Sequence, residues 1–478
     1  MAPHALNHHL ALAGFMGAGK STLGAQVARR LGRAFIDLDR EVEARAGMTI
    51  AELFARDGEA AFRALEESAA ASVLAAGEPA VIALGGGAVL STKTRARLRS
   101  RAFTVLLDVD PDTLWQRASR SARPLASNEE SFRALFQERL PIYEEAADAR
   151  ARDIDSVLLA AAGIEVGIGT IDLLGELVPG CGQIEIVADA TVAGIHGVSA
   201  QLALGARDIA THEVPSGEPA KAIGALDQLW RSLRIGRDGT IVALGGGCTT
   251  DLAGFAAATW MRGVPWVAVP TTLVGQVDAA IGGKTAVDLP GGKNLVGCFH
   301  WPAKVVIDPG TLESLPEAEM RNGMGEVVKT GLLMGSPVWE QPLAEIVRRC
   351  ASFKGAVCLA DPHDRGPRNQ LNLGHTFAHA LEAAAGYDLP HGQAVALGLV
   401  AALRLSGNAE ALASVRSELD PRPVKVDREA AWDALARDKK SVGGVPRLVL
   451  LERNGEPTWD NEVDGTEIRA ALDSLICD

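Results

Sequence analysis

The sequence predicts an α/β protein in three parts: two units built on parallel sheets, followed by a mostly helical one. Over residues 1 to about 155, short apolar runs (HLALAGF, RAFIDLD, AVIALGGG and FTVLLDV) alternate with amphipathic helical stretches, which is typical of a parallel sheet covered by helices. A second alternating region runs from about 163 to 310, and from about 311 onward helical patterns dominate until RLVLLERNG. We expect the first boundary within SVLLAAAGIEV, at 156–166, and domains at 1–160, 163–310 and 311–478.

Charge and hydropathy narrow the classes of function. The 478 residues carry a formal net charge of −13, which disfavours nucleic acid and anionic membranes as partners. The longest uncharged apolar run, GQAVALGLVAAL at 392–403, is shorter than the roughly 20 residues that cross a membrane and predicts a core helix. The first residues, MAPHALNHH, lack the basic and apolar segments of an export signal, so we expect a cytoplasmic protein.

Cysteine spacing gives no sign of disulfides or of a structural zinc knuckle. No CxxC pair occurs among the six cysteines, which are Cys181, Cys248, Cys298, Cys350, Cys358 and Cys477. We expect most of them to be buried as small hydrophobic residues. Isolated histidines such as His196, His212 and His300 are expected to be hydrogen-bonded core residues.

The first unit carries a phosphate-binding motif. GFMGAGKST at 14–22 fits GxxxxGK[ST] with Gly14, Gly19, Lys20 and Ser21, and it lies between a predicted strand and a predicted helix. The glycines let backbone N–H groups surround phosphates, the lysine reaches the β and γ oxygens, and the hydroxyl can ligate Mg²⁺. A glycine turn without a ligand is the alternative, and the lysine and hydroxyl argue against it.

Five further motifs follow in the first unit: DLD at 37–39, GEAAFRALE at 58–66, GGGAV at 85–89, RPL at 123–125 and RLPIYEEAAD at 139–148. Together with the phosphate loop they resemble shikimate kinase over the whole unit. The resemblance implies that Asp37 supports Mg²⁺ and that Asp39 is catalytic and holds the acceptor hydroxyls. Lys20 and Arg123 are the other implied catalytic residues, Arg123 on a lid near the transferred phosphate.

The remaining implied kinase positions bind ligands. ATP with Mg²⁺ would be bound by Gly14, Gly17, Gly19, Lys20, Ser21, Thr22 and Arg117. Shikimate would be bound by Asp39, Arg63, Gly85, Gly86, Gly87 and Arg139. Two arginines suit a carboxylate and a third suits the phosphoryl charge, which favours a kinase over a module that only senses nucleotide. The unit departs from the family in closing with only about two turns of helix, SVLLAAAG.

The rest of the chain holds two features whose local patterns leave several interpretations open. GGGCTTDLAGF at 245–255 follows a predicted strand but lacks GxGxxG spacing, so alone it is weak evidence for a dinucleotide. In LNLGHTFAHALE at 371–382, His375 and His379 lie four residues apart on one helical face, as in a zinc-binding helix. No glutamate lies between them as in HExxH, so both, one or neither of them binding a metal remains open.

Long blocks across 163–478 resemble 3-dehydroquinate synthase: residues 261–297 (MRGVPWVAVP and onward), GMGEVVKTGLL at 323–333, RNQLNLGHTFAHALE at 368–382, HGQAVALGL at 391–399 and DKK at 438–440. The resemblance implies a Zn²⁺ or Co²⁺ ion held by Glu326, His375 and His391. His379 is then a catalytic residue that binds the departing phosphate or moves a proton. The chain is thus expected to be a P-loop kinase domain, an α/β NAD-binding domain and a mostly helical metal-binding domain.

The same resemblance implies a cationic pocket for 3-deoxy-arabino-heptulosonate 7-phosphate. Its matching positions are Lys284, Asn294, Lys329, Lys354, Arg368 and Asn372, with Lys284 and Arg368 also catalytic. NAD would be bound by Asp189, Glu218, Lys221, Gly245, Gly246, Gly247, Asp251, Thr271 and Thr272, with Asp278 and Lys293 shared between the two ligands. Arg262 matches a residue that enters the neighbouring subunit's site, which implies a homodimer. The implied reaction oxidises the substrate with NAD⁺, eliminates phosphate, reduces the ketone again and closes the ring.

The sequence differs from the family pattern at two points, and two other classes of enzyme are alternatives. Thr250 stands where the family has a glycine, and the segment between HGQAVALGL and DKK is short. Another sugar phosphate cyclase is the nearest rival, and Arg368, Asn372 and His379 together favour dehydroquinate as the product. A polyol dehydrogenase would not need the phosphate-binding lysines. Because the synthase product is not the kinase substrate, we expect the two halves to work independently.

Overall fold

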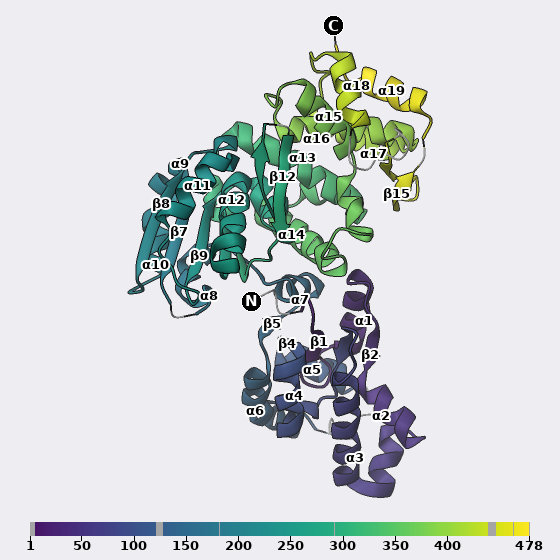
Figure 1. The fold of residues 1–478 in the computed structure, drawn as a ribbon. Helices are drawn as coiled ribbons and strands as arrows, with labels where there is room; N and C mark the ends of the chain where they lie inside the picture. Colours follow the sequence, from purple (N-terminus) through teal and green to yellow (C-terminus); the bar gives the residue numbers. More distant parts are fainter. Residues whose placement is uncertain are drawn as a thin grey trace. The chain divides into compact units, whose positions relative to one another are not determined.

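A computed structural model describes residues 5–120, 128–180, 182–290, 292–437, 446–461 and 463–477. The chain divides into two compact units: unit 1 is Met1–Ile164 with Gly355–Ala360, and unit 2 is Glu165–Lys354 with Asp361–Asp478 (Figure 1). Three sequence predictions, Arg123, the DKK motif at 438–440 and Cys181, lie outside the described residues.

Unit 1 contains a five-stranded parallel sheet in the order β2-β3-β1-β4-β5. Its strands are β1 (His9–Ala13), β2 (Phe35–Asp37), β3 (Val81–Ala83), β4 (Ala102–Leu107) and β5 (Ala149–Ala151). Its helices are α1 (Lys20–Arg30), α2 (Leu38–Ala46), α3 (Ile50–Leu74), α4 (Thr92–Arg101), α5 (Pro111–Ala118), α6 (Glu129–Ala146) and α7 (Ile154–Ala161). The four predicted apolar runs are β1 to β4, which confirms the α/β prediction, and β1 and β4 are buried along their whole length as a parallel sheet requires.

Side-chain caps set where several of these helices begin. Thr49 accepts from the backbone N–H of Glu52 and the Glu52 carboxylate accepts from Thr49, a capping box that starts α3. Asp110 caps α5, which has Pro111 in its first turn. Asp153 and Ser156 form a second capping box at α7, whose eight residues match the short closing helix expected from SVLLAAAG.

Unit 2 begins with a six-stranded sheet in the order β6-β13-β10-β9-β7-β8. Its strands are β6 (Ile164–Val166), β7 (Ile184–Asp189), β8 (Ile209–Val214), β9 (Thr240–Gly245), β10 (Trp266–Pro270) and β13 (Lys304–Ile307). Neighbouring strands from β13 to β8 pair in parallel. The side chains of β7, β9 and β10 contribute to the hydrophobic core, among them Ile186, Val242, Leu244 and Val267. The helices of this region are α8 (Leu174–Leu177), α9 (Ala190–Val192), α10 (Val198–Ala203), α11 (Ile223–Ser232) and α12 (Gly247–Thr259).

An antiparallel hairpin that the sequence analysis did not predict follows this sheet. It consists of β11 (Lys284–Leu289) and β12 (Gly292–Phe299). Strand β12 is exposed over most of its length and carries Cys298. Cys477 is also exposed, whereas Cys350 and Cys358 are buried and Cys248 is half-buried. Two of the five described cysteines are therefore buried, and the expectation that most are buried is wrong because the others lie on an exposed strand, at a chain end and in a cavity wall.

The chain after β13 is mostly helical, as predicted. Its helices are α13 (Glu317–Met334), α14 (Leu343–Ala360), α15 (His375–Ala384), α16 (His391–Leu405), α17 (Ala409–Leu419), α18 (Arg428–Ala436) and α19 (Gly465–Asp473), and a hairpin forms from β14 (Leu448–Leu451) and β15 (Pro457–Asn461). The last residues of α14, Gly355–Ala360, are part of unit 1. The predicted core helix at 392–403 is α16, which is buried from Ala394 to Leu403. Within the described ranges, no helix is long and apolar enough to cross a membrane.

Candidate active sites

The phosphate loop of unit 1 is made chiefly of backbone. It leaves β1 at Gly14 (φ +151°), passes Gly17 (φ +86°) and Gly19 (φ +85°), and enters α1 at Lys20. These φ values favour glycine, and a Cβ on Gly17 would lie 2.8 Å from the Leu114 carbonyl oxygen. The Lys20 ammonium donates to the carbonyl oxygens of Gly14 (2.7 Å) and Phe15 (3.2 Å). The helix N-terminus and this cation together suit an anionic ligand.

A cavity of about 840 Å³ adjoins the loop. Three predicted ATP-binding residues, Gly19, Thr22 and Arg117, line it, and the Arg117 guanidinium donates to the Gly17 carbonyl at 3.4 Å. Ser21 lies in the exposed first turn of α1. Asp108 and Arg152 also line the cavity and pair with each other at 3.0 Å, and sequence reasoning missed both because they lie outside any local motif.

The predicted shikimate residues gather around the GGG turn that follows β3. A Cβ on Gly85 would lie 2.7 Å from an Asp39 carboxylate oxygen, and one on Gly87 would lie 2.0 Å from the Arg63 guanidinium. The Tyr143 hydroxyl donates to the Gly86 carbonyl from α6, the helix that also holds the buried Arg139. Asp37, predicted for Mg²⁺, caps α2 by accepting from the Asp39 N–H at 3.1 Å.

Glu66 belongs to this cluster and was missed. It is 3% exposed, accepts from Arg63 at 2.7 Å, and its other oxygen would lie 2.4 Å from a Cβ on Gly85. Burial raises the pKa of the Glu66 carboxyl, against the opposing effect of the Arg63 guanidinium. The spacing of three from Arg63 along one helix was the available signal.

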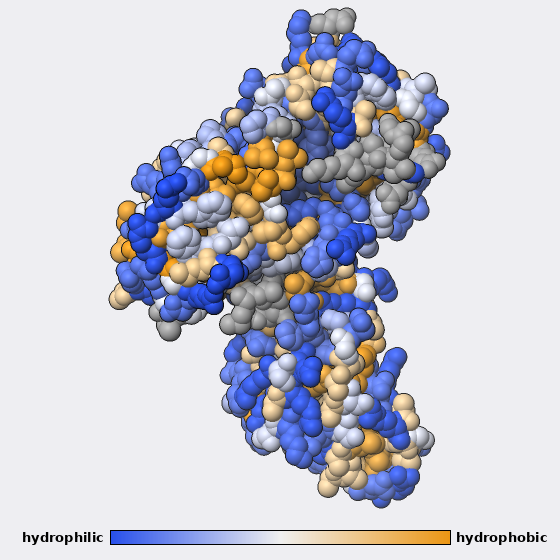
Figure 2. Space-filling model, in the orientation of Figure 1, coloured by the Kyte–Doolittle hydropathy of each residue, from blue (hydrophilic) through white to orange (hydrophobic). Residues whose placement is uncertain are grey.

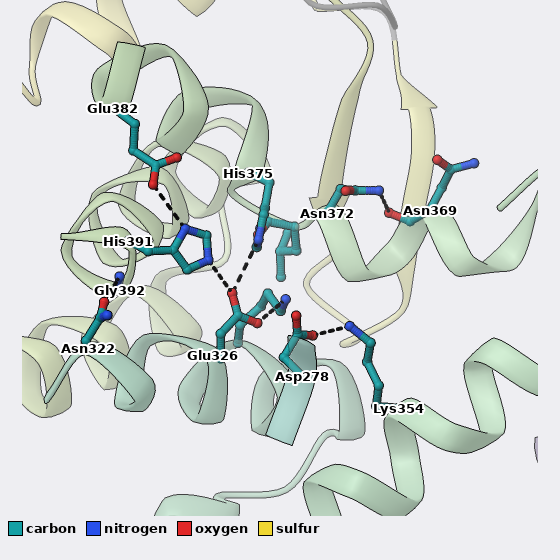
Figure 3. A network of polar contacts seen from close by, with 12 residues as sticks. Asp278, Asn322, Glu326, Lys354, Asn369, Asn372, His375, Glu382, His391 and Gly392 are labelled. Atoms are coloured by element: carbon teal, nitrogen blue, oxygen red, sulfur yellow. Dashed lines mark hydrogen bonds and ion pairs between the residues drawn. The ribbon is translucent and has the colours of Figure 1, made fainter. Parts of the chain in front are cut away.

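In unit 2, three side chains from three helices form a candidate metal centre (Figure 3). Glu326 Oε1 lies 3.3 Å from His375 Nε2 and 3.3 Å from His391 Nε2. Two ligand atoms at the usual distance from a tetrahedral zinc lie roughly 3.3–3.4 Å apart, so the donor set and its spacing fit the predicted ion. The ring of His379 lies 5.4 Å from that of His375 and is not among the three.

Glycines bring these three ligands together. Gly325 precedes Glu326, and a Cβ on it would lie 2.7 Å from the carbonyl oxygen of Gly392, which follows His391. Gly374 precedes His375, and a Cβ on Gly398 would lie 2.0 Å from the Gly374 carbonyl oxygen. Helices α13, α15 and α16 therefore pack backbone to backbone at the centre, and any larger residue would separate the ligands.

Charged partners surround the three ligands. Lys329 pairs with Glu326, and both side chains are at most 2% exposed. The Nδ1 atoms face acceptors: His375 the Leu373 carbonyl and His391 the Glu382 carboxylate, each at 3.2 Å. Burial lowers the pKa of His391 but hydrogen bonds to the two glutamates raise it to about 10, whereas burial and Lys329 lower the pKa of His375.

One cavity of about 670 Å³ joins this centre to the glycine turn after β9. Predicted residues in its wall are Asp189, Glu218, Lys221, Gly246, Gly247, Asp251, Thr271, Thr272, Asp278, Lys284, Asn294, Lys329, Lys354, Arg368, Asn372, His375, His379 and His391. Gly245, Lys293 and Glu326 are not among the residues of this wall, and Arg262 lies on an exposed turn with φ +69°. Thr250 does not line the cavity, because its hydroxyl donates back to the Gly247 carbonyl inside α12. The presence of Thr250 in place of the family's glycine therefore does not block the side of the glycine turn that faces the cavity.

At the end of the cavity near the turn, charged side chains are paired. Lys221 is 5% exposed and donates to Asp251 at 2.7 Å and to Asn294. Burial raises the pKa of Asp251 to about 6, although Lys221 opposes the shift. Lys293 pairs with Glu218 at 2.6 Å. The N-terminus of α12 and these residues suit a dinucleotide.

Asp189 and His196 also lie at this end of the cavity. The Asp189 carboxylate accepts from Thr191 N–H at 2.9 Å and Ser216 Oγ at 2.7 Å, so it also shapes the turn after β7. His196 lines the cavity and bonds Ser314, His212 bonds Glu185, and His300 bonds the Val264 carbonyl. All three histidines are hydrogen-bonded but only half-buried, so the expectation that they are core residues is wrong. Each lies where an element meets solvent or the cavity.

A loop between α14 and α15 carries the charged residues Asp361, Asp364 and Arg368 at the other end of the cavity. Asp361 accepts from the backbone N–H groups of Arg365, Gly366 and Arg368, which fixes the loop. The Arg368 side chain is buried and donates to the Gly282 carbonyl at 3.0 Å. Asp364 pairs with Lys284, and sequence reasoning missed this contact because 80 residues separate the two. Asp278 pairs likewise with Lys354.

Comparisons with known proteins divide the chain at the same place. The shikimate kinase family matches residues 16–160, and the N-terminal and C-terminal families of 3-dehydroquinate synthase match residues 211–322 and 323–441. The 3-dehydroquinate synthase of Symbiobacterium thermophilum is 40% identical over 347 residues, which are 65% of this chain and 97% of that protein. The synthase of Mycolicibacterium vanbaalenii is 39% identical over 321 residues, covering 61% and 89%.

Solved structures resemble unit 2. The 2-epi-5-epi-valiolone synthase ValA of Streptomyces hygroscopicus, solved with NAD⁺ and Zn²⁺ bound, is 27% identical with a TM-score of 0.57, covering 65% of this chain and 96% of that one. A 2-deoxy-scyllo-inosose synthase shares the fold at 24% identity and a TM-score of 0.59, covering 65% and 95%. The rival cyclases are thus similar in fold, whereas the relatives at 40% and 39% identity are 3-dehydroquinate synthases.

Proposed function

The chain belongs to the 3-dehydroquinate synthase family and carries a shikimate kinase domain ahead of it, and we propose which of its residues perform each reaction. It is a bifunctional enzyme of the shikimate pathway, a phosphotransferase and a carbon–oxygen lyase. The kinase half phosphorylates shikimate, and the synthase half converts 3-deoxy-arabino-heptulosonate 7-phosphate to 3-dehydroquinate with release of phosphate.

One observation carries the residue assignment of the synthase: a single cavity is lined both by the glycine turn of α12 and by two of the three candidate ligands, His375 and His391. A reaction that oxidises an alcohol, eliminates phosphate and reduces again needs both sites within reach of one substrate. When bound, NAD exchanges hydride with the substrate, and Zn²⁺ or Co²⁺, held by Glu326, His375 and His391, draws electron density from its hydroxyl oxygens. We propose that Asp189, Lys221 and Asp251, which line the cavity near the glycine turn, would bind NAD.

The cationic side chains between these two ends bind the substrate anions. Lys284, Lys354 and Arg368 are each held by a carboxylate or a carbonyl oxygen, so their positions are set before the substrate arrives. His379 faces the cavity without belonging to the three ligands, which suits proton transfer to the leaving phosphate. Because Lys329 neutralises Glu326, the centre also tolerates the substrate's negative charge.

In the kinase half, ATP with Mg²⁺ supplies the phosphoryl group. Lys20, which donates to the carbonyl oxygens of Gly14 and Phe15, would bind the phosphates of ATP, and Ser21 with Asp37 would hold Mg²⁺. Asp39 accepts the proton of the shikimate hydroxyl, and Arg63 and Arg139 bind the shikimate carboxylate. Arg123 lies outside the described residues, and its proposed contact with the transferred phosphate rests on the resemblance to shikimate kinase alone.

We also propose a cytoplasmic homodimer formed through unit 2. Figure 2 shows hydrophobic surface near β12, where Leu289, Leu295, Val296 and Phe299 are 37–42% exposed. An exposed apolar hairpin of this kind supports an interface between copies of the chain. Arg262 lies on an exposed turn outside its own cavity, which supports its entry into the site of the second subunit. The cytoplasm supplies the ATP and NAD that both halves consume.

The test is an assay of the purified chain for both reactions. We expect turnover of both substrates, with the synthase reaction requiring NAD and a divalent metal and the kinase reaction requiring ATP and Mg²⁺. Synthase activity that persists after exhaustive chelation would contradict the metal assignment. Consumption of another sugar phosphate in preference to 3-deoxy-arabino-heptulosonate 7-phosphate would contradict the residue assignment of the substrate pocket.

A further inference from the structure

We propose that Glu382 is a positioning residue that strengthens metal binding by acting through His391. This inference rests on the proposed metal centre and names a residue that is not one of its three ligands. Glu382 lies on α15, seven residues after His375 and therefore on the same helical face. It is 5% exposed. A buried carboxylate on the helix that supplies one ligand thus reaches the ligand of another helix.

The first argument is the orientation of the His391 ring. Glu382 Oε1 lies 3.2 Å from His391 Nδ1, and Glu326 Oε1 lies 3.3 Å from Nε2 of the same ring, so the two glutamates face opposite edges (Figure 3). A carboxylate only accepts hydrogen bonds, so Glu382 keeps the proton on Nδ1. The Nε2 lone pair then points to the centre, in the tautomer that a metal ligand needs.

The second argument is charge. Glu326 pairs with Lys329, and Asp278 pairs with Lys354, so two carboxylates around the centre are already neutralised. The ion pair that Glu382 forms within the described residues is with His391. When a dication takes the place of the proton on Nε2, His391 is neutral, and Glu382 then supplies a carboxylate charge to the dication in a low-dielectric interior.

His375 provides the internal comparison. Its Nδ1 lies 3.2 Å from the Leu373 carbonyl, which fixes the tautomer as Glu382 does but contributes no charge. The two histidines therefore have acceptors at the same distance from Nδ1, but only the acceptor of His391 carries a negative charge. Removing the Glu382 charge affects one member of the pair and leaves the other intact.

The experiment measures Co²⁺ affinity of the full chain, from the visible absorption of the ion in competition with a chelator. We compare the wild type with Glu382→Gln, which keeps the shape and loses the charge, and Glu382→Ala, which loses both. Substituting a residue that hydrogen-bonds a metal ligand typically weakens metal binding by about 10- to 100-fold, so we expect roughly ten-fold for glutamine and hundred-fold for alanine. NAD affinity should stay within about two-fold of the wild type, because the residues proposed to bind NAD lie at the other end of the cavity and distant substitutions usually act independently.

Glu185→Gln is the matched control. Glu185 is also a buried glutamate paired with a histidine, at 2.9 Å from His212, but it lies on β7 outside the cavity wall. The Glu185→Gln variant should bind Co²⁺ with wild-type affinity, even if its melting temperature changes. If the alanine variant does not fold, the isosteric glutamine variant decides.

Three results would count against the proposal. Wild-type Co²⁺ affinity in both Glu382 variants overturns the role of Glu382 while leaving the metal centre in place. Equal losses of Co²⁺ and NAD affinity in Glu382→Gln show a general structural defect and also overturn it. A wild-type chain that binds no Co²⁺, by contrast, contradicts the proposed metal centre itself.

Discussion

The two sites offer different groups to phosphorylated ligands: mainly backbone N–H groups in unit 1 and mainly charged side chains in unit 2. In unit 1 the phosphate loop offers backbone N–H groups, and its lysine rests on two carbonyl oxygens near solvent. In unit 2 several of the charges are buried side chains held by carboxylates or carbonyl oxygens: Lys329 is 1% exposed, Arg368 2% and Lys221 5%. A nucleotide that brings its own Mg²⁺ can be bound by backbone dipoles, whereas a substrate that changes charge through several steps needs charges fixed in place.

Glycine serves the two sites for different reasons. At Gly17 and Gly19 it provides the left-handed backbone that lets the phosphate loop turn. At Gly325, Gly392 and Gly398 it provides close approach between helices that carry metal ligands. Substitution should therefore damage the first site through backbone conformation and the second through separation of the ligands.

The largest expected effect separates two histidines of one helix. His375→Ala removes one of the three protein ligands. A four-ligand zinc site has a binding free energy of about 10–16 kcal/mol, so each ligand contributes about a quarter of it, and losing one should lower metal affinity by roughly a hundred- to a thousand-fold. His379→Ala should retain the metal and lose turnover, because its proposed work is on protons and phosphate. Elemental analysis of both purified variants measures the difference. Equal metal loss would show that both histidines are ligands.

A smaller effect is expected in the shikimate site. In Gly87→Ala, the new Cβ would lie 2.0 Å from the Arg63 guanidinium and displace this flexible group. Losing a charge-assisted hydrogen bond costs about 1.5–3 kcal/mol, so KM for shikimate should rise roughly ten- to hundred-fold. Thermal stability should change little, since a side-chain end can move aside.

Gly77→Ala is the control for this substitution. A Cβ on Gly77 meets nothing within 4 Å, so the same change should leave KM and stability as in the wild type. Unchanged shikimate KM in Gly87→Ala would contradict the assignment of Arg63 to the substrate carboxylate.

The smallest effect concerns pH. Burial holds the pKa of Asp251 at about 6, above the ordinary range of an aspartate, so the carboxyl takes up a proton as pH falls through 6. The Lys221 bond then loses its charged acceptor. If the ionised form is needed for NAD, affinity should be roughly ten-fold lower at pH 5 than at pH 7.5. Calorimetric titrations should show this slope in the wild type and a flat profile in Asp251→Asn; the same slope in both variants would assign it elsewhere.

The sequence predicted those parts of the molecule that depend on local pattern. Strands β1 to β4 and the helix at His375 follow from apolar runs and helical spacing. The metal ligands were predicted through the resemblance, because spacing alone left His375 and His379 equivalent. The structure distinguishes them, since His375 lies 3.3 Å from Glu326 and belongs to the three-residue group that could hold a metal ion.

What could not be predicted depends on contacts between distant residues. The Lys284–Asp364 pair spans 80 residues, and Arg152 pairs with Asp108 across 44. Hairpin β11–β12 was missed because glycines within GKNLVGCF weaken the strand pattern. The placement of Thr250 away from the cavity likewise required its hydrogen bond to Gly247 to be seen.

The central claim is that each site performs its own reaction with its own residues, and steady-state kinetics of both reactions in Lys20→Ala and His375→Ala test it most directly. Lys20→Ala should abolish shikimate phosphorylation and leave synthase kcat and KM at their wild-type values, and His375→Ala should do the reverse. The measurements are repeated with the other site's ligands present. Loss of both activities in either variant, or a several-fold shift in synthase KM on adding shikimate and ATP, would contradict independence and show that the fusion couples the two reactions.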